Sequence, residues 1–147
     1  MSTDYEKPAF KGIKVGVVRE GYHRWENAPD KCAYLRNWHR HLFKISVTIE
    51  ITNNDRELEF HEMQKLVNHI IDTNYIPEYE DHTFSFSWES FYDDTGQGRD
   101  EDVFVINSCE DFAEWLGKRL YELFEHKRGI TVSVSEDGEN SGMVVFG

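Results

Sequence analysis

Two runs of alternating apolar and polar residues constrain the fold of this chain more than any other feature. In residues 13–17 and 43–51 the apolar side chains fall on odd numbers. Successive side chains of a β-strand point to opposite faces of the sheet, so positions i, i+2 and i+4 share a face. The pattern therefore predicts two strands, over residues 11–23 and 38–52, that each bury their odd-numbered face.

Three histidines continue this buried face. His23, His39 and His41 all fall on odd numbers, so both strands, if they extend that far, carry the imidazoles beyond the apolar part of the same face. Three converging imidazoles with an open fourth position are how proteins hold a catalytic zinc ion. A lone His-x-His pair on a strand is more often incidental, but a third histidine of matching parity favours a metal site. Glu59 and Glu62 are candidate acceptors for the second ring nitrogens.

The remaining elements predict the fold class. Helical spacing of apolar residues indicates one helix over residues 59–72 and another that begins after residue 108. Two further strands follow, near residues 130–135 and 141–146, and residues 24–36 are expected to form a loop. The order β-β-α-α-β-β predicts an α+β domain, in which two helices cover one face of an antiparallel sheet.

The 147 residues are expected to form a single domain, 1–147, with a tail over residues 1–10. Residues 73–107 form an insertion between the two helices. It carries an acidic run and a group of aromatic residues, Phe84, Phe86, Trp88, Phe91 and Tyr92. An ordinary packed insertion with a solvated acidic loop is favoured over a cover for a pocket or a subunit interface.

Charge and composition exclude several classes of function. The chain has 28 acidic and 16 basic residues and a net charge of −12, which disfavours binding to nucleic acid. Its two cysteines do not make a disulfide scaffold. No apolar run is long enough to span a membrane, and the polar N-terminus does not resemble a signal peptide. We therefore expect a cytoplasmic protein.

Several short segments, taken in chain order, are similar to the motifs of one family. On the first two strands, Tyr22-His23-Arg24-Trp25 is similar to the family's Ala-His-Arg-Leu motif, and Cys32 with His39-Arg40-His41 is similar to its cysteine and His-Gly-His pair. At the helix starts, Glu59-Phe60-His61-Glu62-Met63-Gln64 is similar to its Asp-Phe-x-x-Leu-Lys element, and Asn107-Ser108-Cys109-Glu110 is similar to its Thr- and Glu-bearing second helix start. Glu136 falls where the family has a glutamate at the end of the third strand. Over residues 12–147 the chain thus resembles the 6-pyruvoyltetrahydropterin synthase and 6-carboxytetrahydropterin synthase family, as a diverged member.

The resemblance implies the tunnelling fold, in which subunits close their sheets into a barrel with the active site at the subunit interface. It also implies zinc as the cofactor, held by His23, His39 and His41. Long strands with unpaired edges need such closure in any case. We therefore expect a homo-oligomer, with a hexamer as the candidate size.

The catalytic residues implied by the resemblance depart from the family pattern. Cys32 stands where the family has its catalytic cysteine, but Ala33 to Trp38 lengthen the stretch before the His-x-His pair. An ordinary loop cysteine is an equally good interpretation. Asp72 matches the aspartate of an Asp-His pair, whereas Thr73 replaces the histidine. His82, in the insertion, is a candidate substitute.

Glu136 is the candidate for substrate recognition. It shares the parity of the apolar residues of its strand, so its carboxylate points to the buried face and needs a partner. The 2-amino and N3 edge of a pterin or guanine offers two parallel donors to one carboxylate. The alternative is a strand-end glutamate that reaches solvent. Ser108, Cys109 and Glu110 would supply neighbouring polar groups, and plain helix capping can hold at the same time.

The resemblance implies a lyase that acts on 7,8-dihydroneopterin triphosphate and forms 6-carboxytetrahydropterin, toward deazaguanine and queuosine synthesis, or 6-pyruvoyltetrahydropterin. Because the catalytic relay is incomplete, a second hypothesis is a diverged pterin- or purine-nucleotide-binding protein that uses the same zinc pocket. A third is a structural assembly subunit without a site.

Overall fold

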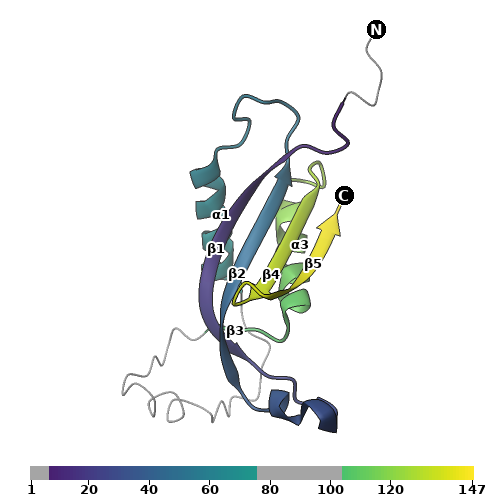
Figure 1. Ribbon diagram of the computed structural model, residues 1–147. Helices are drawn as coiled ribbons and strands as arrows, with labels where there is room; N and C mark the ends of the chain where they lie inside the picture. The colour runs from purple at the N-terminus through teal and green to yellow at the C-terminus, as the bar shows by residue number, and fades with distance from the viewer. Residues whose placement is uncertain (1–6, 76–103) are drawn as a thin grey trace.

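The computed structural model describes residues 7–75 and 104–147, which form one five-stranded sheet with two α-helices on one face (Figure 1). In chain order the elements are β1 (Gly12–His23), the 3₁₀ helix η2 (Asp30–Arg36), β2 (His39–Glu50), α1 (Phe60–Asn74), β3 (Phe104–Val105), α3 (Cys109–Leu123), β4 (Ile130–Glu136) and β5 (Asn140–Phe146). The strand order across the sheet is β3-β1-β2-β4-β5. The predicted α+β class, with two helices on one face of the sheet, is confirmed.

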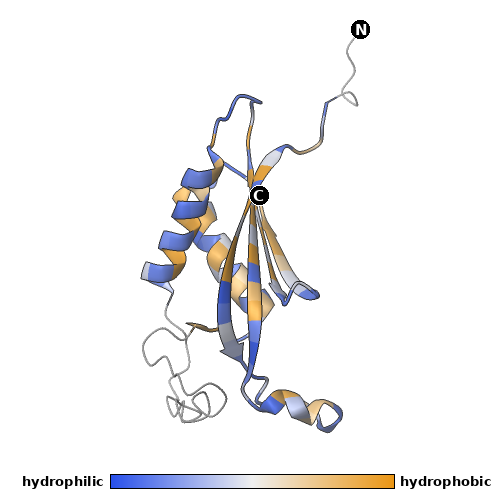
Figure 2. Ribbon diagram, turned by 60° about the vertical axis from the view of Figure 1, so that its left-hand side comes forward, coloured by the Kyte–Doolittle hydropathy of each residue, from blue (hydrophilic) through white to orange (hydrophobic). Residues whose placement is uncertain are grey.

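The alternating pattern of the sequence explains the core. The odd-numbered residues of β1 and β2 and the even-numbered residues of β4 point to the helices, and the apolar faces of the helices point back to the sheet (Figure 2). The fully buried side chains at the centre are those of Phe43, Ile45, Val47, Ile49, Leu116, Leu120, Ile130 and Val132. Burial of this shared face also fixes the register, because a shift by one residue would turn each strand's apolar side chains outward.

Two local features differ from the sequence prediction. Residues 24–36, expected as a loop, contain η2, which starts after Pro29 and buries none of its residues. A short helix held by local hydrogen bonds has no apolar stripe, so periodicity does not reveal it. The short strand β3 pairs in parallel with β1, whereas all other neighbouring strands of the described sheet are antiparallel.

The two ends of the predicted insertion are part of the folded domain. The Tyr75 hydroxyl donates a hydrogen bond to the Val105 carbonyl at 2.8 Å, and its ring contacts those of Phe104 and Phe112. The aromatic residues predicted within the insertion, Phe84, Phe86, Trp88, Phe91 and Tyr92, lie outside the described residues, and so does His82. In the described part of the chain, no helix is long and apolar enough to cross a membrane.

Candidate metal centre and ligand cavity

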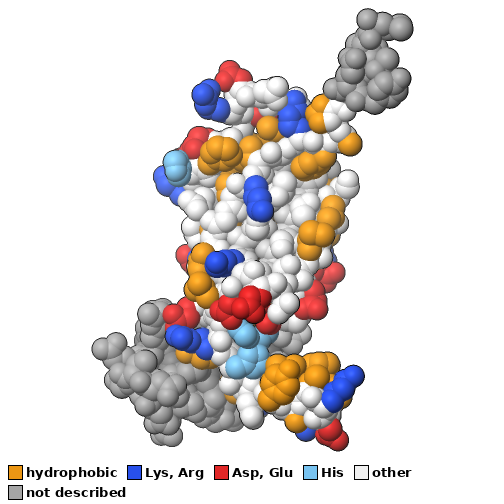
Figure 3. All heavy atoms as spheres, in the orientation of Figure 1, with side chains coloured by type: hydrophobic (Ala, Val, Ile, Leu, Met, Phe, Trp, Pro, Cys, Tyr) orange, Lys and Arg blue, Asp and Glu red, His pale blue; other side chains and the backbone are white. Residues whose placement is uncertain are grey.

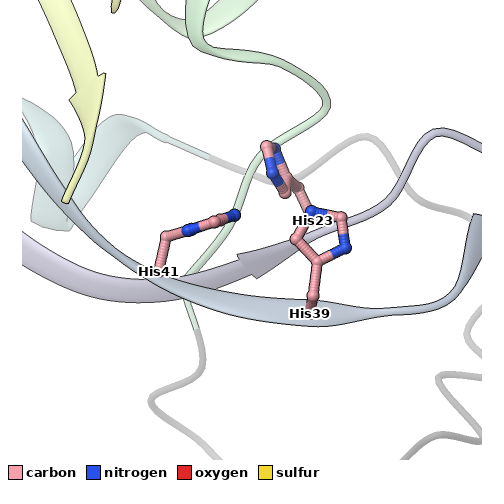
Figure 4. Close-up of side chains that lie close together, drawn as sticks. All are labelled: His23, His39 and His41. Atoms are coloured by element: carbon pink, nitrogen blue, oxygen red, sulfur yellow. The ribbon is translucent and has the colours of Figure 1, made fainter. Parts of the chain in front are cut away.

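Pairing of β1 with β2 brings the three histidines together. The register places His23 directly opposite His39, and His41 lies two residues further along β2. The imidazole centroids are 4.5 Å apart for His23 and His39, 5.1 Å for His23 and His41 and 5.0 Å for His39 and His41. Figure 4 shows the three rings converging from the two strands. One nitrogen from each ring lies within 4.8 Å of the others, which is close enough to hold one metal ion.

Hydrogen bonds orient two of these rings for metal binding. His39 Nδ1 lies 2.8 Å from the Asn37 carbonyl oxygen, and His41 Nδ1 lies 2.7 Å from Asp137 Oδ2. Carbonyl and carboxylate oxygens only accept, so Nδ1 is the protonated nitrogen in both rings. The lone pair of Nε2 is therefore available to a metal. Acceptors on the second ring nitrogen are typical of metal-binding histidines, and an all-imidazole donor set suits zinc.

His23 is the buried member of the cluster, with 8% of its surface exposed. Burial, followed by repulsion from His39 and His41, lowers its pKa from 6.5 to about 4. At neutral pH the ring is therefore uncharged and can donate an electron pair. Phe43 packs beneath the cluster, with ring centroids 5.4 Å from His23 and 5.8 Å from His41. This apolar floor explains why the charged form of the imidazole is disfavoured.

Glu136, the last residue of β4, faces the same histidines. Its Oε1 lies 3.0 Å from His23 Nε2 and its Oε2 lies 3.7 Å from His41 Nε2. The register of β2 with β4 sets this position, because it pairs Glu136 with Phe43, two residues beyond His41. The strand-end carboxylate thus points to the histidine face, as the parity that it shares with the buried apolar residues of β4 predicts.

A cavity of about 670 Å³ opens beside the cluster. Its volume is within the range of small-molecule sites. The described residues of its wall are His23, Arg24, Trp25, Glu26, Asn27, Leu35, His39, Asn107, Ser108, Cys109, Glu110 and Glu136. The cavity therefore extends from His23 and His39 to the start of α3.

The start of α3 supplies polar groups to the cavity wall. The Ser108 side chain caps the helix by accepting a hydrogen bond from the Asp111 amide at 3.1 Å. Burial, followed by the negative charges of Glu136 and Glu110, raises the pKa of the Cys109 thiol to about 12. Cys109 is therefore a protonated thiol at neutral pH. Glu110, one residue further, is exposed and lies in the first turn of α3, whose N-cap is Ser108.

Comparison with known proteins connects this site to a family. The family model described as 6-pyruvoyl tetrahydropterin synthase matches residues 20–146, which include all three histidines and the glutamates Glu110 and Glu136 of the cavity wall. The chain belongs to this family. No curated protein matches it. The fold is similar to that of an uncharacterized protein from Wolinella succinogenes solved by crystallography, with a TM-score of 0.65 and 17% sequence identity over 93% of this chain and 98% of the other.

The other residues that the family pattern marks as catalytic are not brought to this cavity. Cys32 is a free, half-buried cysteine in η2, and it is absent from the described cavity wall. Asp72 is exposed near the end of α1, where its carboxylate pairs with Arg19 at 2.9 Å. Asn68 also accepts a hydrogen bond from Arg19, at 2.8 Å. The three histidines are therefore clustered, whereas Cys32 and Asp72, the described residues that the family resemblance marks for proton transfer, lie outside the described cavity wall.

Two residues of the metal centre were missed by sequence reasoning. The acceptors of the imidazole N–H groups are Asn37 and Asp137, whereas Glu59 caps α1 by accepting from the amides of His61 and Glu62. The Asn37 contact uses a backbone oxygen, which residue type does not reveal. Asp137 precedes a glycine and is typical of a tight turn, so its only sequence signal is its position next to Glu136.

Proposed function

We propose that this member of the 6-pyruvoyl tetrahydropterin synthase family is a zinc-dependent carbon–oxygen lyase that acts on a reduced pterin. The observation that carries the proposal is a cluster of three imidazoles, two of which line one cavity together with Glu136 and Glu110. His23, His39 and His41 would hold the zinc ion. When bound, zinc supplies a Lewis acid that polarises hydroxyl and carbonyl oxygens of the substrate and eases proton removal at the adjacent carbon.

The glutamates and the start of α3 would orient the pterin ring. A carboxylate can accept two parallel N–H donors from the 2-amino and N3 edge of a pterin, and Glu136 and Glu110 are the candidates. The Ser108 hydroxyl and the protonated Cys109 thiol would add short-range polar contacts on the same side of the cavity. The substrate we propose is 7,8-dihydroneopterin triphosphate, with 6-carboxytetrahydropterin or 6-pyruvoyltetrahydropterin as the product. The first product would place the enzyme in deazaguanine and queuosine synthesis.

Proton transfer is assigned to Cys32, Asp72 and His82 on the family resemblance. The assignment predicts that Cys32→Ala, Asp72→Asn and His82→Ala each lower kcat strongly while zinc content stays unchanged. An unchanged kcat in all three variants would show that other groups transfer the protons. Arg19→Met is the matched control for Asp72, because it removes the ion pair and leaves the carboxylate.

The open face of the sheet supports a homo-oligomer such as a hexamer. The α-helices cover only one face, and the other, seen in Figure 3, carries the exposed apolar side chains Val18, Leu42, Met143 and Val145. Burial of such side chains between subunits would close the sheet into the barrel expected for the family. Size-exclusion chromatography with light scattering should give the mass of a multimer, and a monomer alone would contradict this part of the proposal.

The direct test of the lyase is turnover. Zinc-loaded protein is incubated with 7,8-dihydroneopterin triphosphate and the reaction is followed by chromatography, with Glu136→Gln as the matched variant. The proposal predicts loss of the substrate peak with wild-type protein and strongly reduced turnover with the variant. Tight binding of the substrate without turnover would reject the lyase.

A second function is favoured by the dispersed proton-transfer residues. With Asp72 paired to Arg19 and Cys32 away from the described cavity wall, the chain would be a diverged pterin- or purine-nucleotide-binding protein with the same zinc pocket. Mass spectrometry of the small molecules released on denaturation separates the two functions. A co-purifying guanine-type nucleotide supports the binding protein, whereas a reduced pterin product supports the lyase.

A further inference from the structure

The turn between β4 and β5 reaches back to the metal centre. In this turn Asp137 and Gly138 both have positive φ angles, +54° and +78°, and the Glu139 amide donates a hydrogen bond to the Glu136 carbonyl at 2.9 Å. Tight hairpin turns with two left-handed residues favour Asp followed by Gly. The backbone conformation thus accounts for the residue types of this turn, and it leaves the direction of the Asp137 side chain to be explained.

The Asp137 carboxylate is held between two donors on β2. Oδ1 accepts a hydrogen bond from the Leu42 amide at 2.8 Å, and Oδ2 accepts one from His41 Nδ1 at 2.7 Å. The Asp137 amide in turn donates to the Leu42 carbonyl at 2.7 Å. Two hydrogen bonds with Leu42, one to the carboxylate and one from the backbone amide, therefore hold Asp137 against the residue that follows His41, so the imidazole meets an acceptor whose own position is fixed.

His41 differs in this respect from the other oriented ligand. Its acceptor is an ionised carboxylate, whereas that of His39 is the neutral carbonyl of Asn37. A charged acceptor strengthens the hydrogen bond and increases the electron density on the opposite ring nitrogen. Figure 3 shows acidic side chains beside histidine side chains at this end of the sheet. Of these two rings, His41 is thus the one whose donor strength depends on a neighbouring side chain.

We propose that Asp137 is a positioning residue for the metal centre: it holds the His41 ring with Nε2 toward His23 and His39 and strengthens His41 as a ligand. This inference rests on the metal-binding part of the proposed function. It adds a residue outside the histidines themselves, supplied by a hairpin turn that is 96 positions away from His41 in the chain. The turn therefore has two roles, since it closes the hairpin and completes the ligand environment.

The test compares variants that keep the turn. Asp137→Gly removes the carboxylate and suits the left-handed conformation, because glycine adopts positive φ without strain. Asp137→Asn keeps the turn and an acceptor oxygen but removes the charge. Glu139→Gln is the matched control, because it neutralises an exposed carboxylate of the same turn. Zinc affinity is measured by competition with a chromophoric chelator, and the absorption spectrum of the cobalt-substituted protein reports ligand geometry.

The inference predicts that Asp137→Gly weakens zinc binding by about 10- to 100-fold and shifts the cobalt bands, with a smaller loss for Asp137→Asn. Glu139→Gln should match the wild type in both measurements. Wild-type affinity and an unchanged cobalt spectrum in both Asp137 variants would overturn the inference and leave the proposed function standing. Absence of zinc binding by the wild-type protein would instead overturn the metal-binding part of the proposed function, and with it this inference.

Discussion

The metal-free protein should lose stability as the pH falls from 6.5 toward 4, because of His23. Its pKa is about 4 in the folded chain and 6.5 when unperturbed, so the unfolded state binds a proton within this window and the folded state does not. The stabilising contribution of the neutral ring is fully present above pH 6.5, falls as the pH decreases and is lost by pH 4. At about 1.4 kcal/mol per pKa unit, the difference amounts to about 3 kcal/mol.

Urea unfolding in the presence of a chelator measures this effect, at several pH values across the window. His23→Gln removes the titrating group, so the variant should lose about 3 kcal/mol less than the wild type between the two ends of the window. His61→Gln is the control, because it replaces a histidine whose side chain is 84% exposed. The reasoning is refuted if wild type and His23→Gln lose stability in parallel.

Three further predictions concern the wall formed by α3. Gly142→Ala should weaken pterin binding and lower the melting temperature, because the new Cβ would lie 2.7 Å from the Glu110 amide nitrogen and displace the helix start. Unchanged pterin binding and an unchanged melting temperature would contradict this prediction. Ser108→Ala should cost about 1 kcal/mol in urea unfolding through loss of its bond from the Asp111 amide, whereas Ser108→Asp should restore the cap. Cys109 should resist iodoacetamide at neutral pH, since it is buried and its pKa is about 12, and peptide mass spectrometry should find the label on the other cysteine first.

Residue parity predicted the central geometry of the site because the β-strand has a fixed period. Once residues 13–17 and 43–51 are assigned as strands with buried odd faces, His23, His39 and His41 must share a face. The same rule placed Glu136 toward the histidines. What parity does not give is the pairing register, and here the structure sets His23 opposite His39.

Contacts that depend on turns and helix placement were not predictable in this way. The Asp137 carboxylate reaches His41 because a two-residue turn folds it back onto β2, and an Asp-Gly pair looks the same in any hairpin. The ion pair of Asp72 with Arg19 depends on where α1 lies along β1, which periodicity leaves open. Sequence patterns therefore located the candidate ligands, while the groups that orient and surround them required the folded structure.

The most direct test of the candidate metal centre is a measurement of zinc content. The purified protein is loaded with zinc, dialysed and analysed by inductively coupled plasma mass spectrometry. We predict about one zinc ion per chain in the wild type and in the exposed-histidine variant His61→Ala, and a strong decrease in His39→Ala and His41→Ala. Less than about one zinc ion per three wild-type chains would contradict the account and favour a structural assembly subunit without a site. Equal zinc content in wild type and both ligand variants would contradict it as well.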